Sequence, residues 1–210
     1  MFTGIIEEIG TVIAIRESGG KRFVTLSCKQ VLADLKEGDS ICCDGACLTA
    51  ISFDASSVTV EVMHETLSKT TIGAWSRGRK LNLERAMRAA GRFDGHIVQG
   101  HVDTASRLLE ARRSGETLYL AVQLPRQQAA LVVAQGSVAV NGVSLTVSAL
   151  GTDRFEVVLI GHTLAHTNLS SLRSGELVNI EYDILGKYVL RQVESRKGGM
   201  SEEWLREQGY

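Results

Sequence analysis

Short alternations of apolar and polar residues recur along the chain and predict β-strands rather than long helices. The clearest is residues 57–63, Ser-Val-Thr-Val-Glu-Val-Met, which has the period of two of a half-buried strand. Turn signals such as Gly19-Gly20 and Asp44-Gly45 separate these stretches. The first half is therefore expected to form about six strands, at residues 2–15, 22–28, 40–43, 46–53, 57–63 and 79–83.

The second half has the same plan. Pro125 is suited to begin a helical run over residues 126–134, because the first helical position needs no N–H group. Gly136 would end that run. The strands of this half are expected at residues 97–110, 117–123, 137–141, 143–150, 155–161 and 177–182.

A few stretches break the strand pattern. Residues 84–92 read as a short helix between the halves, residues 66–72 as a loop or a single turn, and residues 163–167 as a loop. Near the end, residues 187–196 have helical spacing, and a second helical patch lies around Trp204-Leu205. This tail resembles an exposed helix that needs a partner surface.

The two halves are copies of one domain. Asp-Gly-Ala-Cys-Leu-Thr at residues 44–49 returns as Asn-Gly-Val-Ser-Leu-Thr at residues 141–146, and the ungapped alignment continues to residues 84 and 181. Gly-Ile-Ile-Glu at residues 4–7 pairs with Gly-His-Val-Asp at residues 100–103. Identical in both copies of the longer stretch are Gly45, Leu48, Thr49, Val60, Thr66, Leu67, Thr70, Gly78, Asn82 and Glu84.

Short, evenly spaced strands without β-α-β alternation predict an all-β protein. We expect two tandem six-stranded antiparallel Greek-key barrels related by internal duplication, plus a C-terminal α-helix. The expected domains are residues 1–96, residues 97–185 and a tail, residues 186–210, for oligomerisation. Because so few short strands close a barrel too narrow for an internal ligand, a ligand must lie on a rim or between barrels.

Composition narrows the classes of function. The chain has 210 residues, 44% hydrophobic and 22% charged, which suits two small globular domains. A net charge of -1 provides no basic field, so nucleic acid is not an expected partner. Charge or glycine interrupts every long apolar stretch, so no membrane span is expected. Residues 1–8 lack the features of a signal peptide, and we expect a cytoplasmic protein.

All four cysteines, Cys28, Cys42, Cys43 and Cys47, lie in the first copy. If disulfides stabilised the fold, the second copy would lack the same crosslinks, so we expect reduced thiols. Cys43 and Cys47 have a spacing that could suggest a metal pair. Since no second pair completes a tetrahedral site, we expect no metal.

A small polar group and a threonine recur beside the turn of each copy: Cys47 with Thr49, and Ser144 with Thr146. In one copy alone, such residues could merely satisfy nearby backbone groups. Their recurrence favours two related binding sites, with the change from thiol to hydroxyl indicating different roles.

A loop comes after an alternating strand in each copy, at residues 64–67 and 161–164. Free backbone amides and carbonyls in these loops could bind a planar heterocycle. Alternatively, Thr66 and Thr163 only cap the next helical turn. The two roles are compatible.

His101 is the ionisable residue with the strongest case for chemistry. It stands where the first copy has Ile5, and a titratable group in only one of two related sites suits acid–base work. His96 would face the opposite side of a strand, so the two histidines cannot share a metal. Asp183 could orient a hydroxyl or a histidine, or could be a solvated carboxylate. The chain has no P-loop, no G-x-G-x-x-G after a strand and no G-x-S-x-G.

Taken together, these motifs resemble the riboflavin synthase family of the α-chain type over essentially the whole chain. The resemblance lies in the opening Met-Phe-Thr-Gly-Ile-Ile-Glu, in Gly-Ala-Cys-Leu-Thr, in Gly-His-Ile-Val-Gln-Gly-His-Val-Asp-Thr and in Asn-Gly-Val-Ser-Leu-Thr. It implies that two molecules of 6,7-dimethyl-8-ribityllumazine react, one giving a four-carbon unit to the other, to yield riboflavin and 5-amino-6-ribitylaminouracil.

The resemblance also implies an assembly. Family members are homotrimers held together by the C-terminal helix, with each site between the N-terminal barrel of one subunit and the C-terminal barrel of another. No metal or redox cofactor is implied. Association with lumazine synthase is a further interaction that the resemblance raises.

Site residues are carried over from the family by position. The resemblance implies catalytic roles for Cys47, His101, Ser144, Thr146 and Asp183. It implies substrate binding by Gly4, Ile5, Ile6, Cys47, Leu48, Thr49, Glu61, Val62, Met63, His64, Glu65, Thr66, Gly100, His101, Val102, Gln135, Ser144, Leu145, Thr146, Val158, Leu159, Ile160, Gly161, His162 and Thr163. Gln135 departs from the family, in which Lys is usual. The rival interpretations are a lumazine- or flavin-binding protein without turnover and a small barrel that binds nucleic acid.

Overall fold

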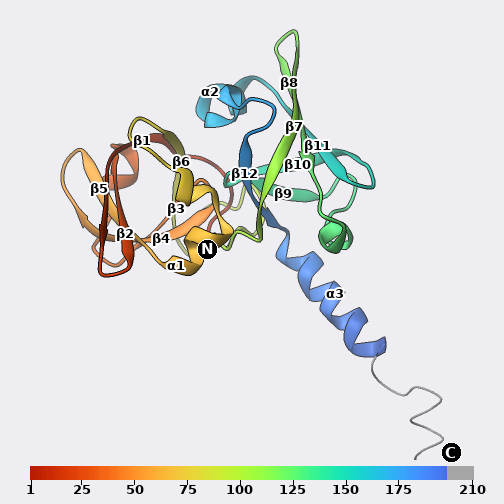
Figure 1. Cartoon of the computed structure of the whole chain (residues 1–210), viewed down its shortest axis with the longest axis horizontal. Helices are drawn as coiled ribbons and strands as arrows, with labels where there is room; N and C mark the ends of the chain where they lie inside the picture. Colours follow the sequence, from red (N-terminus) through yellow and green to blue (C-terminus); the bar gives the residue numbers. More distant parts are fainter. Residues whose placement is uncertain (198–210) are drawn as a thin grey trace, which may run out of the picture.

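The structure is a computed structural model that describes residues 1–197, and it contains two closed six-stranded antiparallel barrels (Figure 1). In the first barrel the strands lie in the order β1-β2-β5-β4-β3-β6. The hairpin-connected strands β3, β4 and β5 with β2 beside β5 form a Greek key. The strands are β1 (Glu8–Ser18), β2 (Lys21–Ser27), β3 (Ser40–Cys43), β4 (Ala46–Phe53), β5 (Ser57–Val62) and β6 (Lys80–Arg85).

The second barrel has the same topology, with the circular order β10-β11-β8-β7-β12-β9. Even the irregularities repeat, because β1 and β7 each shift register near their middle, between Val12 and Ala14 and between Leu108 and Glu110. The predicted fold class is confirmed. The strands are β7 (Thr104–Ser114), β8 (Thr117–Gln123), β9 (Ser137–Val140), β10 (Val143–Leu150), β11 (Arg154–Leu159) and β12 (Leu177–Tyr182).

Each barrel is filled by its own side chains. The alternation in β5 places Val58, Val60 and Val62 inside the first barrel, fully buried. Phe155 and Ile180 are equally buried in the separate core of the second. Burial of branched apolar side chains is the main favourable term in forming each barrel. Ligands are therefore restricted to the outside of the barrels.

The predicted first strand of each half begins too early. Residues 2–7 precede β1, and residues 97–103 precede β7. These stretches are irregular and leave the barrel to which they are covalently attached, and Phe2 pairs with Val98 across the molecule. Apolar alternation predicts an extended chain without predicting which surface that chain covers.

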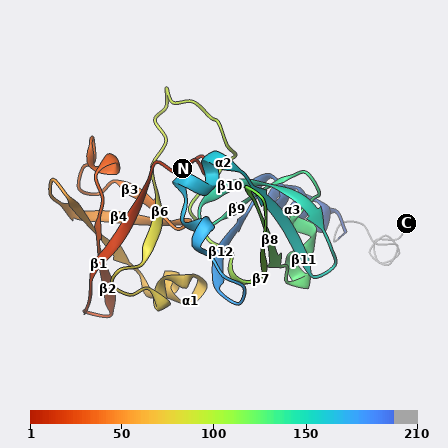
Figure 2. The same ribbon diagram turned by 90° about the horizontal axis from the view of Figure 1, so that it is seen from above.

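The helix predicted over residues 84–92 is wrong. Strand β6 continues to Arg85, and the linker after it is a loop (Figure 2). The N–H group of Met87 donates to the carbonyl oxygen of Met1 (2.9 Å), which draws the linker toward the N-terminus. The N–H group of Met87 is therefore bonded to the N-terminal segment and not within a helical turn.

The loops predicted over residues 66–72 and 163–167 contain single helical turns, so the prediction of a loop over the latter range is wrong. Met63 and Ile160 precede α1 and α2, and neither helix has a side-chain N-cap bond, so Thr66 and Thr163 are not caps. The short helices are α1 (His64–Lys69), α2 (Gly161–His166), and the 3-10 turns η1 (Gln30–Leu32), η2 (Thr71–Ala74), η3 (Arg126–Leu131) and η4 (Asn168–Ser171).

The helical run after Pro125 is the 3-10 turn η3, which is shorter than predicted. The left-handed residue beyond it is Gln135 (φ 64), and not Gly136. A Cβ atom on Gly136 would lie 2.5 Å from a methyl group of Val133, so this glycine is required for close packing.

The two barrels meet at their Asx-Gly turns. A Cβ atom on Gly45 would lie 2.8 Å from the backbone nitrogen of Gly142, and the reverse distance is the same, 2.8 Å. Around this contact, Asn82 Nδ2 donates to the carbonyl oxygen of Asn141 (3.0 Å). Asn179 Nδ2 donates to that of Asp44 (2.7 Å). The reciprocal bonds relate the barrels by an approximate twofold axis.

Asp44 and Asn141 occupy equivalent places at this junction, and both are fully buried. One Asp44 oxygen accepts from the Asn82 N–H (2.8 Å) and from Asn168 Nδ2 (2.8 Å). The other has no hydrogen-bond partner among the described residues, and the guanidinium of Arg79 is 4.0 Å away. Burial raises the pKa of the Asp44 carboxyl to about 7.

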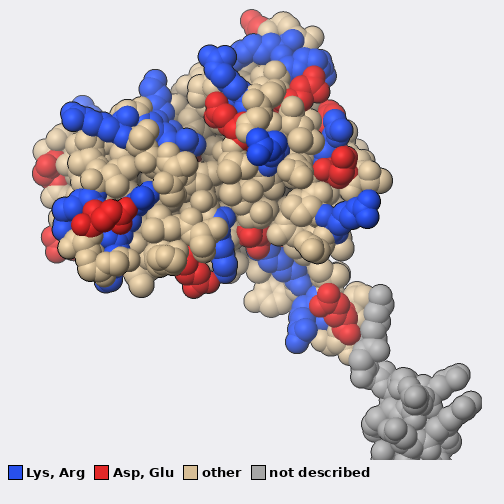
Figure 3. All heavy atoms as spheres, in the orientation of Figure 1, with Lys and Arg blue, Asp and Glu red and all other residues tan. Residues whose placement is uncertain are grey.

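Helix α3 (Ile184–Lys197) extends from the second barrel away from both barrels (Figure 1). Asp183 caps it, accepting from the N–H of Leu185 (3.0 Å), and Lys187 pairs with Asp103 (2.7 Å). The predicted helical patch around Trp204-Leu205 lies outside the described residues. No described helix is long and apolar enough to cross a membrane. Charges of both signs are interspersed over the face drawn in Figure 3.

Asp44→Asn is expected to change how stability depends on pH. The native carboxyl keeps its proton up to about pH 7, whereas the unfolded one loses it near pH 3.9, so wild-type stability falls as pH rises between these values. Asparagine removes this loss, so the stability of Asp44→Asn relative to wild type should increase by on the order of 3 kcal/mol from pH 5 to pH 8. Urea unfolding at pH 5 and pH 8 measures the difference. Asp153→Asn, on an exposed turn, should show no such change; an unchanged pH dependence in Asp44→Asn would contradict the assignment.

Candidate functional site

Each barrel is completed by a segment from the other half of the chain. We call residues 2–6 and 98–102 the crossing segments. Gly4 lies on the second barrel, where its carbonyl oxygen accepts from the N–H of Ser144 (2.8 Å). Gly100 lies on the first barrel, where its carbonyl accepts from the N–H of Cys47 (2.8 Å). Each half of the chain therefore contributes a short segment to the barrel formed by the other half.

Glycine is required at the centre of both crossing segments. Gly4 (φ +78) and Gly100 (φ +80) adopt the left-handed conformation. A Cβ atom on Gly4 would lie 2.6 Å from that of Ser144, and one on Gly100 would lie 2.5 Å from that of Cys47. No side chain fits between the crossing segment and the residue beneath it.

The first site is a hollow of about 300 Å³ on the first barrel. Strand β4 supplies Cys47, helix α1 supplies Glu65 and Thr66, and the crossing segment supplies Gly100, His101 and Val102. Six residues expected from the sequence line it together, namely Cys47, Glu65, Thr66, Gly100, His101 and Val102, along with Ala46, Lys69 and Thr70. The sequence prediction did not include these last three.

Lys69 and Thr70 were missed because the loop expected to bind a ligand covered residues 64–67 only, and residues 66–72 were expected to form a loop or a single turn. In helix α1, Lys69 is one turn beyond Glu65, and the two side chains pair at 2.8 Å. The hydroxyl of Thr70 donates to the carbonyl oxygen of Thr66 (2.7 Å). The hollow thus combines a thiol, hydroxyls, an ammonium group and a histidine, which suit the polar edge of a ring with a hydroxylated chain.

The second site is centred on Ser144. Its Oγ is 2.7 Å from Nδ1 of His96, which is almost fully buried. The other ring nitrogen of His96 is buried without a hydrogen-bond partner among the described residues. Burial lowers the pKa of His96, and the negative charge of Asp183 opposes that shift.

His96 is the main residue that the sequence prediction missed. The prediction placed His96 and His101 on one strand, facing opposite sides. Neither is in a strand, because residues 96–102 form part of the irregular crossing between barrels. His96 contacts the second barrel, whereas His101 lines the first site.

Comparison with known proteins places this architecture in a family. The family model for the lumazine binding domain matches twice, at residues 3–86 and 99–183. Riboflavin synthase of Actinobacillus pleuropneumoniae is 37% identical, with all of both chains covered. Riboflavin synthase of Bacillus subtilis (strain 168) is 41% identical over 91% of this chain and 89% of that one. This chain belongs to the riboflavin synthase family.

Solved structures of LumP have the same fold as this riboflavin synthase family member. LumP complexed with 6,7-dimethyl-8-(1'-D-ribityl) lumazine aligns with a TM-score of 0.78 at 19% identity, covering 87% of this chain and 99% of LumP. LumP complexed with riboflavin aligns with a TM-score of 0.79 at 20% identity and the same coverage, 87% and 99%. At these identities the likeness concerns the fold alone.

The other family-derived candidates in the first barrel are not among the residues that line the first site. Thr49 is exposed on β4 opposite Glu61, which pairs with Lys21 (2.8 Å). Leu48 and Val62 are buried in the core, so only their backbone groups could reach a ligand. The remaining two, Met63 and His64, are exposed where β5 leads into α1.

Family-derived candidates in the second barrel occupy matching places. Ile6 packs on the second core together with Leu164. Thr146 is exposed on β10, opposite Ser137. The others are the buried Leu145 and Leu159, the half-buried Val158 and Thr163, and the exposed Gln135, Ile160, Gly161 and His162. His162 stacks on His166 at 4.0 Å within helix α2. Asp183 caps α3, which is a structural role that the sequence prediction did not include.

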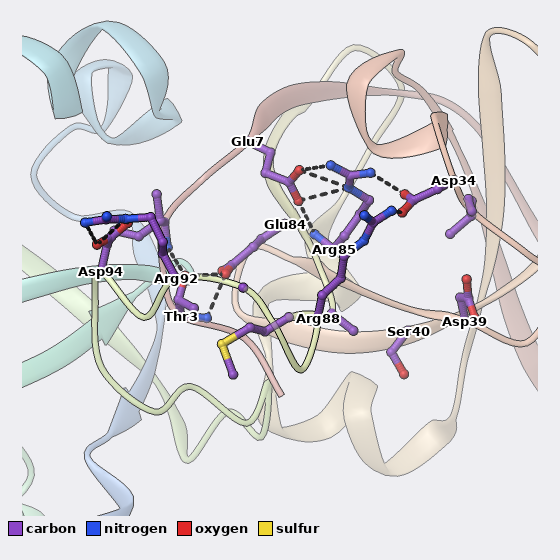
Figure 4. A pocket seen from close by; sticks show the side chains of 15 residues that line it. Thr3, Glu7, Asp34, Asp39, Ser40, Glu84, Arg85, Arg88, Arg92 and Asp94 are labelled. Atoms are coloured by element: carbon purple, nitrogen blue, oxygen red, sulfur yellow. Dashed lines mark hydrogen bonds and ion pairs between the residues drawn. The ribbon is translucent and has the colours of Figure 1, made fainter.

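A larger hollow of about 480 Å³ lies between the first barrel and the linker (Figure 4). Arg85 pairs there with Glu7 and Asp34, and Arg88 pairs with Asp34. Ile5, expected from the family to bind substrate, lines this hollow. Its charged groups are largely paired with one another, so they hold the linker and leave little for a ligand.

Gly100→Ala is expected to separate the crossing segment from Cys47. The added methyl group both strains a left-handed residue and overlaps Cys47, so a loss of about 2–4 kcal/mol in the free energy of unfolding is expected. Gly78→Ala is the matched control, because Gly78 has φ +90 but nothing within 4 Å of the added atom. It should lose only about 1 kcal/mol. Urea unfolding measures both, and equal losses would contradict the close contact.

Proposed function

We propose that this chain is a riboflavin synthase: it converts two molecules of 6,7-dimethyl-8-ribityllumazine to riboflavin and 5-amino-6-ribitylaminouracil by transfer of a four-carbon unit. The observation that supports this best is the pair of related sites, Cys47 beneath Gly100 and Ser144 beneath Gly4. Two copies of one substrate need two similar pockets. The products together contain the atoms of the two substrates, so the reaction needs no external oxidant or reductant.

The main contribution of such sites to catalysis is to hold the two substrate molecules close together in a reactive orientation. Holding two reactants in an attacking geometry can supply roughly 7–11 kcal/mol of the barrier. The C7 methyl of the lumazine is inherently acidic, because the ring delocalises the resulting anion. Backbone groups and hydroxyls at the rims of both sites would bind the ring edges and the ribityl chains.

His96 and Ser144 are the proposed proton carriers of the second site. Because burial lowers the pKa of His96, its ring is neutral at pH 7 and can accept a proton. The hydrogen bond to Ser144 fixes the ring and links it to the Ser144 hydroxyl, through which a proton could pass to a bound ligand. In the first site, Cys47 and His101 would assist the other ring. Thr146 and Asp183, both from the second half of the chain, would have supporting roles in the second site.

The assembly is proposed to be a homotrimer in the cytoplasm, with each reaction centre shared between the first barrel of one subunit and the second barrel of another. Helix α3 supports self-association, because Leu185, Tyr188, Val189 and Val193 are 46–67% exposed. Association with lumazine synthase rests on the family resemblance, and co-sedimentation of the two purified proteins tests it.

Incubation of the purified protein with 6,7-dimethyl-8-ribityllumazine alone tests the function. Riboflavin should appear, detected by its fluorescence, with equal amounts of the diaminouracil product. Tight binding without product would overturn the proposal and favour a binding protein. Salt-sensitive retention on DNA would instead favour nucleic-acid binding.

His96→Ala is expected to lower turnover by about 10²–10³-fold while leaving it measurable, since approximation remains. In wild type the lowered pKa of His96 should place the acid limb of kcat/KM below the ordinary histidine value of about 6.5. The substitution should abolish that limb, whereas His101→Ala should retain it. A limb unchanged in His96→Ala would contradict this role.

Tyr188→Glu combined with Val189→Glu is expected to yield monomers with little turnover, because charge on the exposed apolar face of α3 prevents its burial between subunits. Sedimentation velocity measures the state of association, and the lumazine assay measures turnover. Arg191→Ser, an already polar position on the same helix, is the control. A fully active monomer would contradict the shared site.

A further inference from the structure

Two buried glutamates occupy equivalent places in the last strand of each barrel. Glu84, in β6, is 4% exposed, and Glu181, in β12, is 2% exposed. Carboxylates are almost never buried without strong compensation, because desolvation of the charge is unfavourable. Hydrogen bonds at these two positions must therefore compensate for the burial of both carboxylates.

The hydrogen bonds to both carboxylates come from the crossing segments. Glu84 accepts from the N–H of Thr3 (2.7 Å), the hydroxyl of Thr3 (2.7 Å) and the N–H of Gly4 (2.9 Å). Glu181 accepts from three successive N–H groups, those of Gln99 (2.6 Å), Gly100 (2.9 Å) and His101 (3.0 Å). All six donors are uncharged, and five of them are backbone N–H groups. Each carboxylate therefore binds the backbone of a crossing segment.

These segments carry the binding residues of the opposite barrel. The segment that Glu181 of the second barrel holds places Gly100 on Cys47 and His101 in the first site. The segment that Glu84 of the first barrel holds places Gly4 on Ser144 of the second site. Each carboxylate thus acts on the site of the barrel to which it does not belong.

We propose that Glu84 and Glu181 are positioning residues, each of which fixes the crossing segment that completes the opposite barrel's site. Only a carboxylate offers two oxygens that accept several N–H groups and donate none. Such charge-assisted hydrogen bonds are about twice as strong as neutral ones, which suits a segment without a strand partner in the barrel. The catalytic consequence rests on the proposed function, whereas the structural one does not.

Glu181→Gln should loosen the segment over Cys47 and leave the barrels folded. Glutamine keeps the shape of the side chain but directs an amide NH₂ group toward N–H donors. The change should raise the rate at which Cys47 reacts with iodoacetamide by about tenfold, the effect of losing one charge-assisted hydrogen bond. Cys28, Cys42 and Cys43 are buried in the barrel and its junction, and they should stay unreactive.

Glu84→Gln is the matched control. It removes the equivalent carboxylate, but the segment it frees lies on Ser144, so the reactivity of Cys47 should remain that of wild type. Peptide mass spectrometry of the labelled full chain assigns the reaction to each cysteine. Equal Cys47 rates in wild type and both variants would overturn the proposal, as would parallel labelling of all four cysteines, which indicates general loosening.

If Glu181→Gln does not fold, Glu181→Asp gives the same comparison, since it keeps the charge but shortens the side chain by one methylene. In the lumazine assay, both Glu181→Gln and Glu84→Gln should lower turnover by about 100-fold, as small misplacements of binding groups do. Val122→Ala, a truncation in the second core, controls for lost stability and should keep its turnover at 20 °C. Selective Cys47 labelling without any wild-type turnover would retain the positioning role and reject the proposed function.

Discussion

The structure depends on the contact between the two glycine turns at the barrel junction. Gly45 and Gly142 approach so closely that a single added carbon on either would overlap the backbone of the other. The reciprocal hydrogen bonds of Asn82 and Asn179 span this close junction. Because the junction lies between the motifs that carry Cys47 and Ser144, it also sets where the two sites lie. The duplicated turn therefore forms the interface between the barrels and also fixes the positions of Cys47 and Ser144.

Exchange of segments is a consequence of this close docking. Once the barrels touch at their turns, residues 2–6 and 98–102 are near enough to reach across, and Phe2 pairs with Val98 between them. Each site then contains groups from both halves of the chain. A single barrel would lack the segment that covers its cysteine or serine, which gives a physical reason for the two copies to remain in one chain.

Much of this architecture could be predicted from the sequence. Strands such as residues 57–62 have an unbroken alternation, and the repeat with its Asx-Gly turns implies two equal barrels. The crossing segments could not be predicted, because alternation does not distinguish a strand of one barrel from an extended segment on another. The position of His96 against Ser144 depends on that same crossing. The place of Lys69 depends on the helix at residues 64–69, a turn too short for periodicity to reveal.

The halves differ most beyond their last strands. After β6 the chain turns back as the linker, whereas after β12 it continues as helix α3. The near-twofold relation therefore stops at the outer ends of the molecule, and the two ends present unlike surfaces to other copies. A contact between one end of a molecule and the unlike end of the next molecule is heterologous. Such contacts either close into a ring or continue into an open filament.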